Sequence, residues 1–201
     1  NIDYKKILNL NFYGRDLYRH ITENRVSPKL NSFVDILLNS IRFEEFQLLG
    51  FSIFSWYHFL FALLLAQGMK RRGNQPIVFG GPFISFYGHL YPEALNFIDF
   101  MIVGESMVPM LKLSEYLAGR IGLCEIPNLL YKENSKFNSN FRQSYSIENM
   151  PIPDFSDFSL SKYINFHSNI FSRRATLLYY QISRGCINNC IYCVQKDLYR
   201  M

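Results

Sequence analysis

Three of the four cysteines lie close together near the end of the chain. Cys186, Cys190 and Cys193 form a C-x3-C-x2-C pattern, and this spacing lets three thiolates converge on one metal centre. Thiolates are the typical ligands of soft centres such as iron–sulfur clusters and zinc. The pattern therefore predicts a metal site, with a disulfide pair or incidental thiols as the alternatives.

The number of thiolates helps to choose between the two kinds of centre. A structural zinc site normally has four protein ligands, and the remaining candidates, Cys124 and His167, are distant in the sequence. A four-iron cluster held by three cysteines keeps one iron open to an outside ligand, as catalytic zinc sites keep an open position. The cysteines favour an iron–sulfur cluster, and a zinc knuckle stays as an alternative.

The segment just before the cysteines has the pattern of a short buried strand. Residues 176–182 are apolar or β-forming, and Gly185 ends the run. Barrel enzymes place their active sites at the carboxyl ends of such strands.

With Tyr192 before the third cysteine and Ser183-Arg184-Gly185 before the first, the loop resembles the cluster loop of the radical S-adenosylmethionine enzymes. The resemblance implies that the three cysteines hold a 4Fe-4S cluster whose open iron chelates S-adenosylmethionine. It implies cleavage to a 5'-deoxyadenosyl radical, with Tyr192 near the adenine. It also implies an electron donor such as flavodoxin or ferredoxin, and a small-molecule or peptide substrate.

Upstream, short apolar stretches alternate with helical patterns. We expect strands at 5–11, 46–54, 76–79, 98–103 and 129–131, and helices at 15–23, 28–39, 56–72, 91–97 and 108–118. The alternation predicts an α/β fold with a Rossmann-like parallel sheet covered on both faces.

Beyond the last of these strands the sequence becomes polar, with a short strand candidate at 143–147 and a Pro-x-Pro-Asp segment at 151–154. We therefore expect a Rossmann-like domain at 1–132 and a linker at 133–172. Residues 173–201 would then be the first strand and cluster loop of an incomplete (β/α) barrel.

Three glycine-containing segments lie at the ends of predicted strands, where parallel sheets bind their ligands: Gly50-Phe51-Ser52, Gly80-Gly81-Pro82 and Gly104-Glu105-Ser106. These strand ends resemble the cobalamin-binding domain that precedes the barrel in a large class of radical S-adenosylmethionine enzymes. The resemblance implies that Ser52, Gly80 and Gly81 line the pocket for the nucleotide tail of cobalamin. The full set of predicted cofactor-binding residues outside the cysteines is Ser52, Gly80, Gly81, Pro82, Gly104, Glu105 and Tyr192.

One position departs from that family. Asn11 stands where domains with a protein ligand to cobalt have a histidine, and an amide is a poor metal ligand. We therefore expect no histidine coordination from this loop. His58 and His89 are expected to be structural, because neither has a partner at ligand spacing. A sheet domain that binds nothing is the alternative.

The composition and charge of the chain argue against several classes of function. The formal net charge is +5 and the pI is about 9.0, but the basic residues are dispersed apart from one run at 70–72, which argues against nucleic-acid binding. The first residues lack the apolar core of a signal peptide, so we expect a cytoplasmic protein. Residues 48–65 approach membrane-spanning length, but polar residues interrupt them and favour a strand followed by a helix, with no membrane contact.

Together these features predict the N-terminal portion of a cobalamin-dependent radical S-adenosylmethionine enzyme, with methyl transfer to an unactivated carbon as the leading reaction. Only eight residues follow Cys193 in the 201-residue chain, whereas a full barrel needs on the order of 200. We expect this chain to be a fragment or truncated product that does not turn over by itself. The competing prediction is a non-catalytic module that binds cobalamin or zinc.

Overall fold

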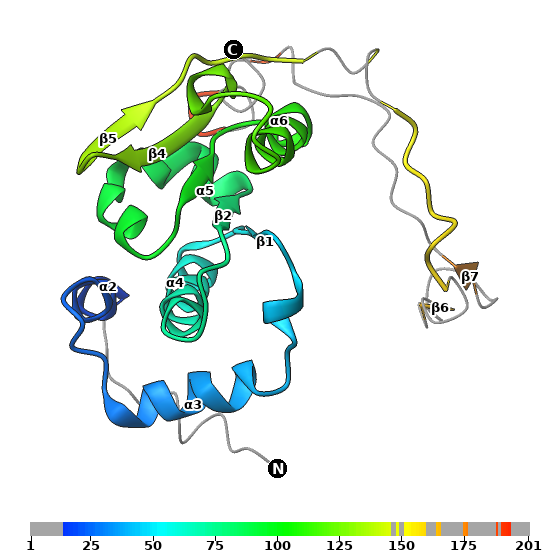
Figure 1. Cartoon of the computed structure of the whole chain (residues 1–201). Coiled ribbons are helices and arrows are strands. Elements are labelled where there is room, and N and C mark those ends of the chain that lie inside the picture. Colours follow the sequence, from blue (N-terminus) through cyan, green and yellow to red (C-terminus); the bar gives the residue numbers. More distant parts are fainter. Residues whose placement is uncertain are drawn as a thin grey trace.

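The structure is a computed structural model that describes residues 14–145, 148, 151–159, 164–165, 175–176, 188 and 190–193. Its main helices are α2 (Gly14–Thr22), α3 (Pro28–Leu38), α4 (Trp56–Lys70), α5 (Pro82–Tyr87) and α6 (Met107–Leu117) (Figure 1). Its strands are β1 (Leu49–Ser52), β2 (Ile77–Gly80), β3 (Phe100–Ile102), β4 (Leu129–Glu133), β5 (Lys136–Ser139), β6 (Ile164–Asn165) and β7 (Ala175–Thr176). Short 3-10 helices are η1 (Phe43–Glu45), η2 (Gly88–Leu90), η3 (Pro92–Asn96) and η4 (Leu123–Glu125).

Serine caps explain where two of the long helices begin. The Ser27 hydroxyl accepts a hydrogen bond from the Leu30 N–H at 3.3 Å, and Pro28 occupies the first turn of α3, where its missing N–H costs nothing. Ser55 caps α4 through the His58 N–H at 3.4 Å. The predicted helices at 15–23, 28–39, 56–72 and 108–118 are confirmed to within a few residues.

The main sheet has the order β1-β2-β3-β4-β5. The first three strands are parallel, as predicted, and Ser52 lies beside Gly80 at the carboxyl ends of β1 and β2. The predicted first strand at 5–11 lies outside the described residues. The two short strands β6 and β7 pair antiparallel to each other.

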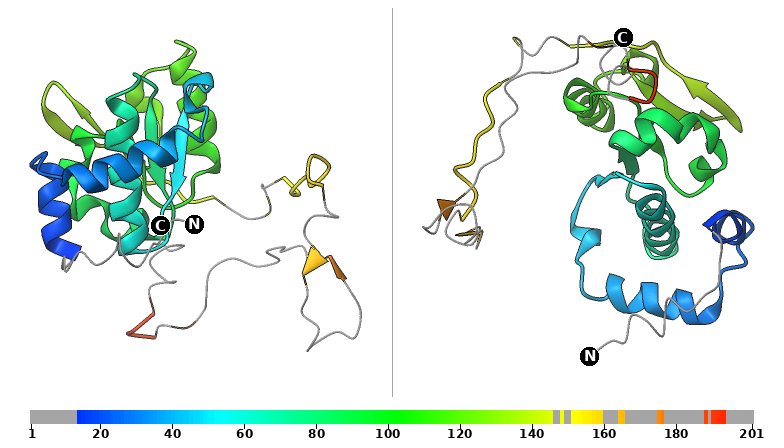
Figure 2. Two further views of the ribbon diagram at one scale, coloured as in Figure 1. Left: turned by 90° about the horizontal axis from the view of Figure 1, so that it is seen from below. Right: turned by 180° about the vertical axis from the view of Figure 1, so that it is seen from behind.

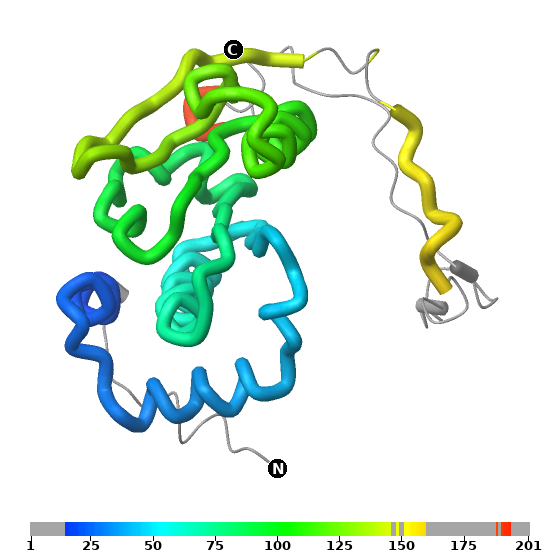
Figure 3. Tube along the Cα trace, in the orientation of Figure 1, coloured from blue at the N-terminus to red at the C-terminus, as the bar shows by residue number. Residues whose placement is uncertain are grey.

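The prediction that residues 129–131 form a parallel strand is wrong. After α6 the chain returns to the carboxyl edge of the sheet, where the Val103 N–H donates to the Asn128 carbonyl at 2.9 Å, so β4 must run antiparallel to β3 (Figure 3). Asn134 and Ser135 then both take positive φ, as in a two-residue hairpin turn, and β5 pairs with β4.

Some local features differ from the prediction or were not predicted. Residues 82–87, for which the sequence predicted no element, form α5, and within the predicted helix at 91–97 residues 92–96 form a 3-10 helix. β5 lies within the range assigned to the linker, 133–172. Residues 143–145 are not in a strand, and 146–147 lie outside the described residues. The domain boundaries stay predictions.

Both faces of the sheet are covered, which gives three layers (Figures 1 and 2). Phe79 and Met101 join the core shared with α2, α3, α4 and α5. Val78 and Ile102, one residue away on the same strands, join the core under α6. This alternation is the two-residue period of a strand buried on both faces.

The apolar stretch at 48–65 divides into β1 and the first part of α4, as predicted. α4 has 15 residues, and among the described helices none combines the length and apolar character needed to cross a membrane.

Candidate functional site

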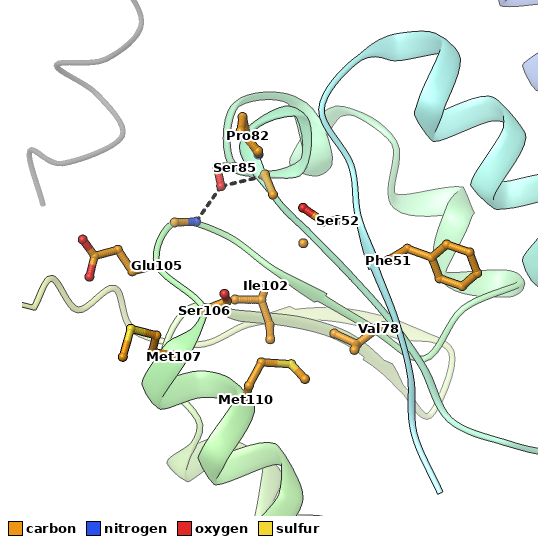
Figure 4. A pocket seen from close by; sticks show the side chains of 14 residues that line it. Phe51, Ser52, Val78, Pro82, Ser85, Ile102, Glu105, Ser106, Met107 and Met110 are labelled. Carbon is orange, nitrogen blue, oxygen red and sulfur yellow. Dashed lines mark hydrogen bonds between the residues drawn. The ribbon is translucent and has the colours of Figure 1, made fainter. Parts of the chain in front are cut away.

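A cavity of about 470 Å³ opens at the carboxyl ends of β1, β2 and β3 (Figure 4). Six residues that the sequence singled out separately line it together: Ser52, Gly80, Gly81, Pro82, Gly104 and Glu105. Whether they bind a cofactor stays a prediction. Tyr192, the remaining cofactor residue of the prediction, does not line this cavity. Neither does His58 or His89, and both are exposed.

Gly81 allows two backbone segments to approach each other closely at this cavity. Its φ is +93°, and a Cβ atom built there would lie 2.7 Å from the Ile53 carbonyl oxygen and 2.8 Å from the Ile53 nitrogen. Two backbone hydrogen bonds stabilise this contact. The Ile53 N–H donates to the Gly80 carbonyl at 2.8 Å, and the Phe83 N–H donates to the Ile53 carbonyl at 3.0 Å. Only glycine fits this position without strain.

Gly80, one residue earlier, is glycine in a different setting. It ends β2 on the α6 side of the sheet, and the nearest atom to a Cβ built there is the Ile102 carbonyl oxygen at 3.9 Å, an ordinary contact. A methyl group at this position would therefore fit without pressing on the backbone.

The loop after β3 is held to the loop after β2 by a residue that sequence reasoning missed. The Ser85 hydroxyl donates to the Gly81 carbonyl at 2.9 Å and accepts from the Gly104 N–H at 2.9 Å (Figure 4). Gly104 has a φ of +87°. The sequence signal was weak, because Ser85 becomes part of the site only once residues 82–87 are known to be helical.

The cavity has two chemically different walls. The polar lining comes from glycine backbone, from the hydroxyl-bearing residues Ser52, Ser85 and Ser106, and from the acidic residue Glu105. The opposite wall is apolar and comes from the β2, β3 and α6 side of the sheet: Val78, Ile102, Met107 and Met110. Organic ligands bind in cavities of this type, with a mostly apolar surface and a few placed polar groups. The apolar wall was missed because its residues belong to ordinary core patterns in the sequence.

A segment that follows β5 is attached beside the β3 loop. The Asn128 side chain exchanges two hydrogen bonds with the backbone of Gln143, each at 2.8 Å, and the Arg142 guanidinium donates to the Val103 carbonyl at 3.2 Å. The chain thereby places Tyr145 near Glu105. Burial, and secondly the charge of Glu105, raise the pKa of the Tyr145 phenol.

The cysteine loop is described only in part. Cys190 and Cys193 are joined in one tight turn by a hydrogen bond from the Cys193 N–H to the Cys190 carbonyl at 3.1 Å, and Tyr192 between them is 86% exposed. Cys186 lies outside the described residues, so the three-cysteine centre stays a prediction. Within the described ranges, no three His, Cys, Asp or Glu side chains gather as a metal site would require.

No protein-family model matches the sequence, and no curated protein matches it. Among solved structures the chain is similar to the cobalamin-dependent S-adenosylmethionine radical enzyme OxsB with aqua-cobalamin and S-adenosylmethionine bound. The identity is 17% and the TM-score 0.43, over 60% of this chain and 17% of that one. It is also similar to the radical S-adenosylmethionine methyltransferase TsrM from Kitasatospora setae with tryptophan substrate and a SAM analog bound. There the identity is 12% and the TM-score 0.40, over 64% of this chain and 27% of that one. The chain thus spans a minor part of either protein, and likeness at this level carries no argument about ligands or activity.

Proposed function

We propose that this chain is the N-terminal portion of a cobalamin-dependent radical S-adenosylmethionine enzyme, with methyl transfer to an unactivated carbon as its reaction. The observation that carries the proposal is the convergence of six residues on one cavity. They were selected from three separate stretches of sequence, and they line a single space at the carboxyl edge of the sheet.

The cavity suits the nucleotide tail of cobalamin in both size and chemistry. About 470 Å³ lies within the usual range of small-molecule sites, roughly 300–1,000 Å³. At the polar wall, Gly81 and Gly104 have no side chains, so a ligand can approach the backbone, and Ser52 provides a hydroxyl. On the apolar wall, the methionines of α6 provide a surface for a flat ring. Bound cobalamin would supply a transferable methyl group, while the chain's own residues hold the tail and exclude water from it.

The cysteine turn suits a shared metal centre. Two thiols three positions apart in one tight turn can reach the same ion or cluster, and neither Cys190 nor Cys193 is in a disulfide. With Cys186 as the third ligand they would hold a 4Fe-4S cluster, which would supply the electron that cleaves S-adenosylmethionine.

Titration with hydroxocobalamin, followed by absorbance, tests the cavity. We expect saturable binding by the wild-type chain and by Gly80→Ala, because a methyl group fits there. Gly80→Leu should bind at least about tenfold more weakly, since its larger side chain occupies cavity space, and its melting curve is measured to show that it is folded. A folded wild-type chain that does not bind, or a Gly80→Leu variant that binds as well as Gly80→Ala, would contradict the proposal.

Anaerobic reconstitution with iron and sulfide tests the cysteines separately. We expect about four irons per chain in the wild type and in Cys124→Ser, which removes an exposed thiol away from the motif. Cys190→Ser and Cys193→Ser should each lose most of the bound iron. Stoichiometric zinc without iron uptake would instead support the zinc-binding alternative.

A further inference from the structure

Ser85 makes two hydrogen bonds that join separate parts of the cavity wall. Its hydroxyl donates to the carbonyl of Gly81, in the loop after β2, and accepts from the N–H of Gly104, in the loop after β3, both at 2.9 Å (Figure 4). A serine hydroxyl has one donor and two acceptor positions, so both bonds form at once. The Ser85 side chain therefore links the loop after β2 to the loop after β3, whose Gly104 lies 19 residues further along the chain than Ser85.

The bond from Ser85 to the Gly81 carbonyl is of a kind common in helices, whereas the bond from the Gly104 N–H to Ser85 is not. Serine in a helix often donates to the carbonyl four residues earlier, and Ser32 in α3 does so with Pro28 at 2.9 Å. Ser32 is exposed, and among the described residues its hydroxyl has no bond to another segment. Ser85 differs because it also satisfies the backbone N–H of a glycine at the cavity.

That N–H belongs to a loop whose shape depends on it. Gly104 has a φ of +87°, which places its peptide outside the strand ladder, and β3 ends at Ile102. A half-buried N–H that loses its acceptor costs free energy, so the Gly104 peptide would turn to find another partner. The spacing of the two loops, and with it the width of the cavity, would then no longer be fixed.

We propose that Ser85 is a positioning residue of the cavity: by holding the Gly104 peptide to the loop after β2, it sets how tightly the cavity holds its ligand. The identity of that ligand rests on the proposed function, whereas the link between the two loops does not. Ser85 acts on the ligand through Gly104 and the Gly81 loop.

The test compares Ser85→Ala with Ser32→Ala, which removes the same kind of helical bond from a site far from the cavity. In ¹⁵N-labelled chain we expect the Gly104 amide to exchange roughly tenfold faster in Ser85→Ala. The Phe83 amide, which is bonded to the Ile53 carbonyl, serves as the internal reference and should keep its rate. Affinity for hydroxocobalamin should fall about five- to tenfold in Ser85→Ala and stay the same in Ser32→Ala.

Each other outcome counts against a specific claim. Unchanged Gly104 exchange overturns the proposal, and so does faster exchange at both Gly104 and Phe83, because Ser85 would then only stabilise α5. Unchanged cobalamin affinity in a variant with faster Gly104 exchange overturns the role in binding. If the wild-type chain binds no cobalamin while Gly104 alone exchanges faster, the proposed cofactor is wrong and the loop link stands.

Discussion

The two ends of the parallel strands are built in opposite ways. At the amino edge, the Asp99 carboxylate accepts from the Ile77 N–H at 2.7 Å and forms an ion pair with Lys70 at 2.8 Å. Lys70 also donates to the Gln75 carbonyl at 3.0 Å. At this edge, Lys70 and Asp99 therefore bind each other, and each also bonds to the backbone.

At the carboxyl edge, Gly80 ends β2, Gly104 follows β3 by two residues, and a cavity opens between them. Gly81 and Gly104 have positive φ, and Ser85 joins their loops through two hydrogen bonds. Under the proposed function, the amino edge serves stability and the carboxyl edge serves the ligand, as is usual in open parallel sheets. Variants that affect one property without the other test this contrast.

The largest effect is expected from the same substitution at two adjacent glycines. Gly81→Ala forces a Cβ to within 2.7 Å of the Ile53 carbonyl at a φ of +93°, so we expect a loss of about 3 kcal/mol or more in unfolding free energy. Gly80→Ala should be neutral or stabilise by about 0.5 kcal/mol, because alanine is better than glycine in a strand. Urea denaturation measures both. Equal effects at the two positions would show that the close approach at Gly81 is unimportant.

A smaller effect is expected at the amino edge. Asp99→Ala leaves the buried Ile77 N–H without its acceptor and should cost about 1–3 kcal/mol, while hydroxocobalamin affinity stays the same. Asp157→Ala, at an exposed turn, is the control and should change stability by less than about 0.5 kcal/mol. A marked loss of cobalamin affinity in Asp99→Ala would mean that the two edges are not independent.

The sequence was sufficient for the features that depend on local chemistry. Pro28 marks the start of α3, and strand-end glycines mark places where the backbone turns sharply, so Gly80 and Gly104 could be selected in advance. Ser52 was selected through the family resemblance. Because parallel strands end at the same edge, these separate stretches were expected to share a site.

Features that depend on contacts between distant segments were not predictable. The direction of β4 is set by where the chain returns after α6, at the carboxyl end of β3, where the Val103 N–H donates to the Asn128 carbonyl. The role of Ser85 depends on a loop 19 residues away. The residues of the apolar cavity wall look like core residues in the sequence, and only the structure shows that Met110 and Ile102 also line a space.

The smallest effect concerns a group beside the carboxyl edge. Burial is the larger cause of the raised pKa of Tyr145 and the charge of Glu105 the smaller, so Glu105→Gln should lower that pKa only part of the way towards its ordinary value of 10.0. The raised pKa means that the unfolded chain ionises first as pH rises. The contribution of Tyr145 to stability is therefore complete below about pH 10 and falls above it. Subtracting the absorbance titration curve of Tyr145→Phe from that of the wild-type chain isolates the titration of the Tyr145 phenol. A midpoint at or below 10.0 would show that the segment after β5 does not hold Tyr145 beside Glu105 at the cavity edge.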